Sequence, residues 1–65
     1  MSHIADTIHV LINKSDIYIE KADAAMMEYE YTGNPTFLDV AQDYAELSTD
    51  CNKTVQILME ALQEE

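Results

Sequence analysis

The sequence predicts an all-α fold, an antiparallel two-helix hairpin that completes a four-helix bundle by dimerising or by co-folding with a partner. The only glycine and the only proline among the 65 residues stand together at Gly33-Asn34-Pro35, near the midpoint. On both sides of this break, apolar residues recur at the spacing of a helix with one buried face. We expect one helical-hairpin domain over residues 1–65, with helices over about 3–32 and 35–64 and a turn at 33–35.

The first helix is predicted from a heptad pattern that never shifts. When Ile8 is assigned to position a of a heptad abcdefg, apolar or small residues fill positions a, d and e. These residues are Ile4, Ala5, Ile8, Leu11, Ile12, Ser15, Tyr18, Ile19, Ala22, Ala25, Met26 and Tyr29. A stripe this wide is typical of a helix that faces a bundle core.

Residues 7–20 also allow a β-hairpin, because residues 7–12 and 17–20 are rich in β-branched side chains. The connecting segment 13–16 lacks the Asn-Gly or Asp-Gly of a tight hairpin, and an isolated two-stranded ribbon is barely stable. The heptad pattern continues through this segment. The helix is therefore favoured, and the β-hairpin stays open as the alternative.

The turn and the second helix follow from local chemistry. Gly33 suits the left-handed conformation that ends a helix, Asn34 is a favoured N-cap, and Pro35 is a favoured first helical residue. Asp39 lies near the positive end of the helix dipole. When Phe37 is assigned to position a, the second stripe at positions a, d and e holds Phe37, Val40, Ala41, Tyr44, Leu47, Ser48, Cys51, Thr54, Val55, Leu58, Ala61 and Leu62.

Folding about the turn predicts that Ser15 lies near Cys51, that Tyr18 and Ile19 lie near Ser48, and that Ala22 lies near Tyr44. Large residues would therefore tend to face small ones. Two helices alone leave part of each stripe in water, and a four-helix bundle hides more of it. We expect a homodimer or a bundle with a partner protein. Its predicted core is Ile4, Ile8, Leu11, Ile12, Ile19, Met26, Phe37, Tyr44, Leu47, Cys51, Val55, Leu58 and Leu62.

A further apolar row on the first helix is a candidate partner-binding surface. Val10, Ile17, Ala24 and Tyr31 recur at heptad position c, roughly opposite the main stripe. We call this row the outer stripe. An aligned row suggests a contact with another helix, whereas scattered exposed residues do not. Weak exposure softened by neighbouring lysine stems is the competing explanation.

Charge restricts the class of partner. Thirteen acidic and three basic residues give a net charge of −10, which argues against direct binding to nucleic acid or to an anionic membrane. On the second helix Asp39, Asp43, Glu46 and Asp50 form one line, which we call the acidic ridge. Such a ridge fits a basic protein surface or imitates a row of phosphates. A solvated, solubilising face explains it equally simply.

No catalytic, cofactor or metal site is predicted. The chain lacks a Ser/His/Asp set, a glycine-rich phosphate loop and a paired cysteine motif. Asp6 and His9 have an Asp-x-x-His spacing, but they lie on a polar face, away from the core where metal-binding bundles place their ligands. Cys51 is the single cysteine, and no secretory signal is evident, so we expect a non-enzymatic, cytoplasmic protein.

The segment Asn34-Pro35-Thr36-Phe37-Leu38, with Gln42 following, resembles the Asn-Pro-x-x-Leu opening of the second helix in type III secretion needle subunits. The small hairpin co-chaperones of those needles are similar in length and organisation. The resemblance covers less than half of the chain and implies a secretion-assembly protein whose apolar stripes a partner shields. The hairpin also resembles Rop-like RNA-binding dimers in outline, but it lacks their basic residues.

Together these features predict a small acidic interaction module, an adaptor, small chaperone or inhibitor, that acts through apolar helix faces and the acidic ridge. The alternatives are a needle-assembly co-chaperone-like protein and an acidic nucleic-acid mimic that inhibits a basic protein.

Overall fold

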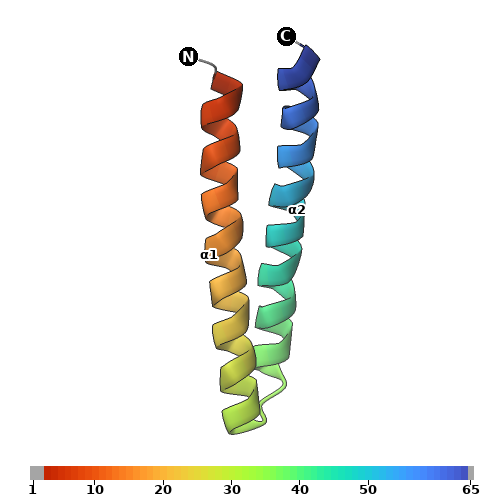
Figure 1. The fold of residues 1–65 in the computed structure, drawn as a ribbon. Helices are drawn as coiled ribbons and strands as arrows, with labels where there is room; N and C mark the ends of the chain where they lie inside the picture. The colour runs from red at the N-terminus through yellow and green to blue at the C-terminus, as the bar shows by residue number, and fades with distance from the viewer. Residues whose placement is uncertain (1–2, 65) are drawn as a thin grey trace.

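Two long helices lie side by side in the computed structural model, which describes residues 3–64 (Figure 1). Helix α1 spans His3–Thr32 and helix α2 spans Thr36–Glu64. They run antiparallel, so the start of α1 and the end of α2 lie at the same end of the hairpin, opposite the turn. The all-α hairpin is confirmed, and residues 7–20 are helical throughout, so the β-hairpin alternative is wrong.

The turn follows the chemistry of its three residues. Gly33 adopts a positive φ of 73°, and its N–H donates to the carbonyl of Tyr29 at 2.7 Å, which closes α1. The Oδ1 of Asn34 accepts a hydrogen bond from the backbone N–H of Thr36 at 3.0 Å, as an N-cap does. Helix α2 begins at Thr36, one residue later than predicted, because Pro35 still belongs to the turn.

Small side chains dominate the interface between the two helices. The buried residues of α1 are Ile8, Ser15, Ala22 and Ala25, and those of α2 are Ala41, Ser48 and Val55. Alanine and serine let the helix backbones approach closely, but they contribute little apolar area to the core. Larger residues at the edges, such as Leu11, Phe37 and Leu58, are only half-buried. The hairpin therefore has a thin core.

The pairing of layers differs from the prediction. The Oγ atoms of Ser15 and Ser48 are 2.8 Å apart, and the ring of Tyr44 stacks on that of Tyr18 with centroids 6.1 Å apart. Small residues therefore meet small ones and large residues meet large ones at these two layers. The prediction that large residues face small ones is wrong here. One helix is displaced along the other by less than one turn relative to the predicted pairing, and this displacement is enough to change which residues meet.

The hairpin also leaves part of the predicted bundle core exposed. Ile12, Ile19 and Met26, at position e of α1, keep between 40% and 46% of their surface in solvent. Leu47, at position d of α2, is 43% exposed. One neighbouring helix covers only part of a stripe three positions wide, which is why these side chains are not buried.

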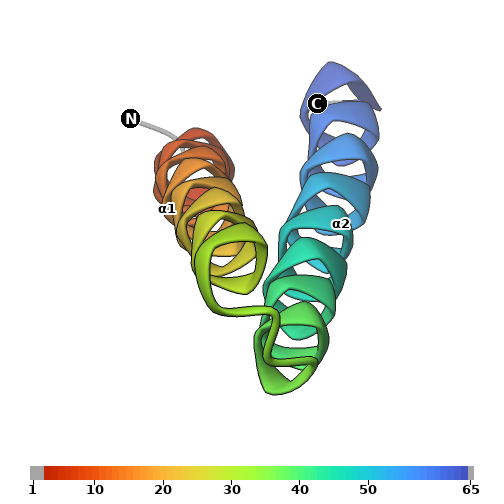
Figure 2. The ribbon, with the colours of Figure 1, turned by 90° about the horizontal axis from the view of Figure 1, so that it is seen from below.

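The two helices cross at an angle, as the view from the turn shows (Figure 2).

Candidate interaction surfaces

The main candidate site is an apolar groove between the helices near the turn. It is an open groove with a volume of about 430 Å³, lined by Ala22, Asp23, Met26, Leu38, Ala41, Gln42 and Ala45. The α1 residues include position e, which the heptad pattern assigned to the core. The α2 residues include position b, which the pattern left outside it. The groove thus joins two rows that the sequence analysis did not connect.

These two rows continue beyond the groove along one side of the hairpin. The α1 row contributes Ile12, Ile19 and Met26, and the α2 row contributes Leu38, Ala45 and Met59, all of them exposed. We call these six residues the groove face. Leu38, Ala45 and Met59 recur at heptad spacing with Asn52 between them. That spacing was the signal that could have revealed the α2 half of this surface.

The other side of the hairpin differs in composition. The Nζ atom of Lys21 lies 5.9 Å from the centroid of the Tyr44 ring, a cation–π contact. Lys14 occupies the same heptad position as Lys21, so two of the three basic residues lie along this side of the hairpin. Lysine stems cover apolar surface while their ammonium groups stay in water. This side therefore carries a lysine over an aromatic ring, whereas the six residues of the groove face include no lysine.

The exposed rows of the predicted core therefore lie on different sides of the hairpin. Each residue advances about 100° around a helix axis. In an antiparallel pair, this rotation places position e of α1 beside position b of α2, as the groove lining shows. Position d of α2, which holds Val40 and Leu47, lies on the same side of the hairpin as Lys21. One flat contact cannot bury both rows.

A polar network crosses the helix interface at mid-length. The hydroxyl of Ser48 donates to the carbonyl oxygen of Ser15 at 3.3 Å, and the Ser15 hydroxyl donates to Oδ1 of Asn52 at 3.1 Å. Ser48 is 2% exposed, so its hydroxyl needs these partners. Thr54 instead bonds to the carbonyl of Asp50 in its own helix at 3.1 Å. The two serines therefore fix the alignment of the helices, and Thr54 does not.

The outer stripe lies on the side of α1 that faces away from α2. Val10, Ile17, Ala24 and Tyr31 are all exposed, and Tyr31 keeps 92% of its surface in solvent. The stripe occupies a single helix, and its residues line neither the groove between the helices nor the hollow beside the acidic ridge described below. It offers a narrower contact than the groove face.

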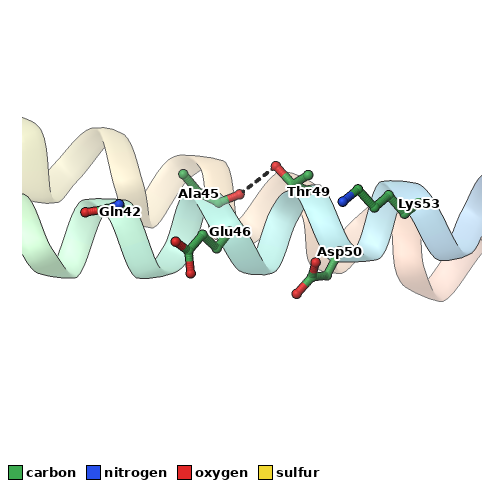
Figure 3. Close-up of a pocket in the computed structure, with 6 residues that line it drawn as sticks. All are labelled: Gln42, Ala45, Glu46, Thr49, Asp50 and Lys53. Atoms are coloured by element: carbon green, nitrogen blue, oxygen red, sulfur yellow. Dashed lines mark hydrogen bonds between the residues drawn. The ribbon is translucent and has the colours of Figure 1, made fainter.

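The acidic ridge lies along the outside of α2. Its four carboxylates are exposed, and none forms an ion pair within residues 3–64. A shallow hollow of about 360 Å³ lies beside the ridge and is lined by Gln42, Ala45, Glu46, Thr49, Asp50 and Lys53 (Figure 3). All six side chains come from α2, and the Oγ1 of Thr49 donates to the carbonyl of Ala45 at 3.0 Å. The hollow is a gap between side chains of one helix.

The His, Asp and Cys side chains considered for metal or redox chemistry lie on the two helices. No group of three or more His, Cys, Asp or Glu side chains within residues 3–64 is arranged to hold a metal ion. Asp6 and His9 lie on α1, as does His3 at its start. Cys51 has a free thiol and is half-buried at the helix interface. In this part of the chain, neither helix has an apolar stretch long enough to cross a bilayer.

Comparison of the chain with models of protein families, with curated proteins and with solved structures finds no match.

Proposed function

We propose that this chain is a small, acidic, non-enzymatic interaction module, an adaptor, small chaperone or inhibitor, whose apolar faces are completed by helices of other subunits. The observation that supports this most strongly is the groove face, a two-helix apolar surface left open beside a thin core. Single exposed apolar residues are common, but exposed apolar residues gathered along two neighbouring helices are typical of an interaction site.

The energetics of a short hairpin support the same proposal. Fully burying one large apolar side chain contributes about 1.5–3 kcal/mol, and the large side chains of the groove face are more than half covered already. Covering the remainder on five such side chains adds several kcal/mol. That gain is comparable with the total stability of a small domain, roughly 5–15 kcal/mol. Association thus contributes a large share of the folding free energy.

The acidic ridge supports a second part of the proposal, the choice of partner. A line of exposed carboxylates that form no ion pair within residues 3–64 attracts a basic protein surface. Two specific versions remain proposals: a co-chaperone-like role in secretion-needle assembly, and imitation of a nucleic-acid phosphate row. The acidic ridge favours imitation of a phosphate row, because its carboxylates repeat along α2 with no basic residue between them. The lone Cys51 fits a reducing, cytoplasmic setting.

Sedimentation equilibrium combined with circular dichroism tests the proposal. We expect the average mass to rise with protein concentration over about a thousandfold range, and the helical signal to rise with it, because folding and association are coupled. A chain that stays monomeric at every concentration, and still melts cooperatively with full helicity, would show that the hairpin is complete by itself. That result would contradict the proposed function.

A further inference from the structure

We propose that the occupant of the groove face is a second copy of this chain, related by a two-fold axis parallel to the helices. In this arrangement α1 of each copy packs on α2 of the other, and both turns lie at the same end of the bundle. The proposal rests on the proposed function and specifies the partner and its orientation. Three observations carry it: the size of the face, the shapes along it and the charges at its edges.

The face has the size of a stable interface. The hairpin measures 50 Å by 16 Å in the plane of its helices. These extents describe a rectangular footprint of roughly 800 Å², which is of the same order as the accessible surface of about 800 Å² that each partner buries in a standard protein–protein interface. The groove face runs along most of the length of this footprint, from Leu38 near the turn to Met59 near the open end. A second hairpin has the same footprint, so it covers the whole face.

The sizes of the side chains favour contact between unlike helices. The contacts Ser15–Ser48 and Tyr18–Tyr44 fix which residues are at the same level along the hairpin. Ile19 is level with Ala45. By the same register, Ile12 is level with Asn52. A two-fold axis parallel to the helices preserves these levels, so each isoleucine of one copy meets the smaller residue of the other. Met26, which is level with Leu38 by the same register, meets a residue of its own size.

The alternative two-fold arrangement packs these residues poorly. An axis perpendicular to the helices places α1 on α1 and α2 on α2, with the turns at opposite ends. With this axis at mid-length, near the level of Ser15 and Ser48, Ile12 of one copy meets Ile19 of the other along α1, while Ala45 and Asn52 face each other along α2. Gaps and crowding are both costly in a packed core, since each forfeits contacts or forces strain. Interlocking of large and small residues is what a well-packed bundle requires.

Charge at the edges of the face favours the same arrangement. Position b of α1, which borders the groove face, holds His9, Asp16, Asp23 and Glu30. Position f of α2, at the opposite edge, holds Gln42, Thr49, Gln56 and Gln63. When α1 packs on α2 of the other copy, carboxylates meet uncharged amides and hydroxyls. When α1 packs on α1, carboxylates of two strongly acidic chains meet each other, which opposes association.

A distance between spin labels tests this arrangement. The exposed Thr36, at the turn, is replaced in a Thr36→Cys, Cys51→Ser double variant, and a nitroxide label is attached to the single thiol that this variant carries. We expect a dimer in which the two labelled helix ends lie across the diagonal of the bundle, about 11–14 Å apart between helix axes when neighbouring helices are about 8–10 Å apart, so that the labels are separated by this distance plus the length of their two arms. The opposite arrangement separates them by about 45 Å, the length of a helix of 30 residues. The Cys51→Ser single variant is the control. In solution it should form an assembly of the same size as the natural chain does.

The outcomes separate this inference from the proposed function. A dimer with the short distance supports both. A dimer with the long distance, or an assembly larger than a dimer, overturns the inferred arrangement and leaves the proposed function intact. A folded monomer of both the natural chain and the control at every concentration overturns both. If only the labelled variant fails to associate, the same label on Tyr31→Cys, Cys51→Ser repeats the measurement at the turn end of α1.

Discussion

The groove face and the outer stripe contain similar side chains but differ in their surroundings. Ile19 of the groove face is 46% exposed and Ile17 of the outer stripe is 48% exposed. Exposure alone therefore does not distinguish them. Ile19 adjoins a second helix that continues the apolar surface, whereas Ile17 lies on a single helix bordered by solvent. The comparison shows that a docking surface is defined by what lies beside an exposed residue.

This matched pair gives the largest expected effect. Ile19→Asp should weaken self-association by about a hundredfold, because a charge is placed in the apolar interface once in each copy. Ile17→Asp should leave association nearly unchanged. The two substitutions have the same helix-propensity cost, so each is the control for the other. Sedimentation equilibrium measures both, and a larger effect of Ile17→Asp would identify the outer stripe as the docking surface.

Overpacking the helix interface should give the next largest effect, this time on the hairpin itself. Ser48→Leu inserts a large side chain where the hydroxyl of Ser48 meets Ser15, and we expect the free energy of unfolding to fall by about 1–3 kcal/mol. Ser48→Ala should cost less than about 1 kcal/mol, because it removes a hydrogen bond without crowding. Urea unfolding at a fixed protein concentration measures both. A neutral Ser48→Leu would show that the helices are not in close contact there.

Salt should strengthen association moderately. Each copy carries a net charge of −10, and the two copies repel each other when they meet. Screening shortens the range of this repulsion to about 10 Å at 0.1 M salt, so we expect the dissociation constant to fall about two- to fivefold between low and moderate salt. Repeating the sedimentation series in sodium chloride tests this expectation. Weaker association in salt would indicate that ion pairs hold the copies together.

The acidic ridge should show the smallest effect. Asp43→Lys with Glu46→Lys changes the ridge, and Asp6→Lys with Glu20→Lys makes the same change in net charge on α1. We expect the ridge variant to bind polylysine a few times more weakly than the control at low salt, because clustered charges act together. Fluorescence titration compares the two. Equal affinities would mean that the ridge acts only through net charge, as a solubilising face does.

The sequence was sufficient to predict the hairpin because its determinants are local. Gly33, Asn34 and Pro35 fix the turn, and the unbroken heptads fix the helical character of residues 7–20 against their β-branched content. The start of α2 was misplaced by one residue. Helix ends depend on individual hydrogen bonds, such as the one between Thr36 and Asn34, which a pattern does not resolve.

The groove face was only half predicted because it depends on the relative rotation of the helices. The heptad pattern predicted Ile12, Ile19 and Met26 as core residues, and the structure leaves them exposed. The pattern did not connect Leu38 and Met59 with them. Which rows meet across two helices is decided by close contacts between small residues such as Ser15 and Ser48. The sequence pattern gives the rows on each helix separately. It does not give the angle at which one helix faces the other.

The most direct test is the mass of the natural chain together with its thermal unfolding, both followed over a wide range of concentration. If the groove face is buried by a second copy, the mass approaches twice 7.4 kDa and the melting temperature rises with concentration. A particle of 7.4 kDa that unfolds cooperatively at the same temperature at every concentration would contradict this. It would mean that the exposed apolar surface contributes nothing to the folded state.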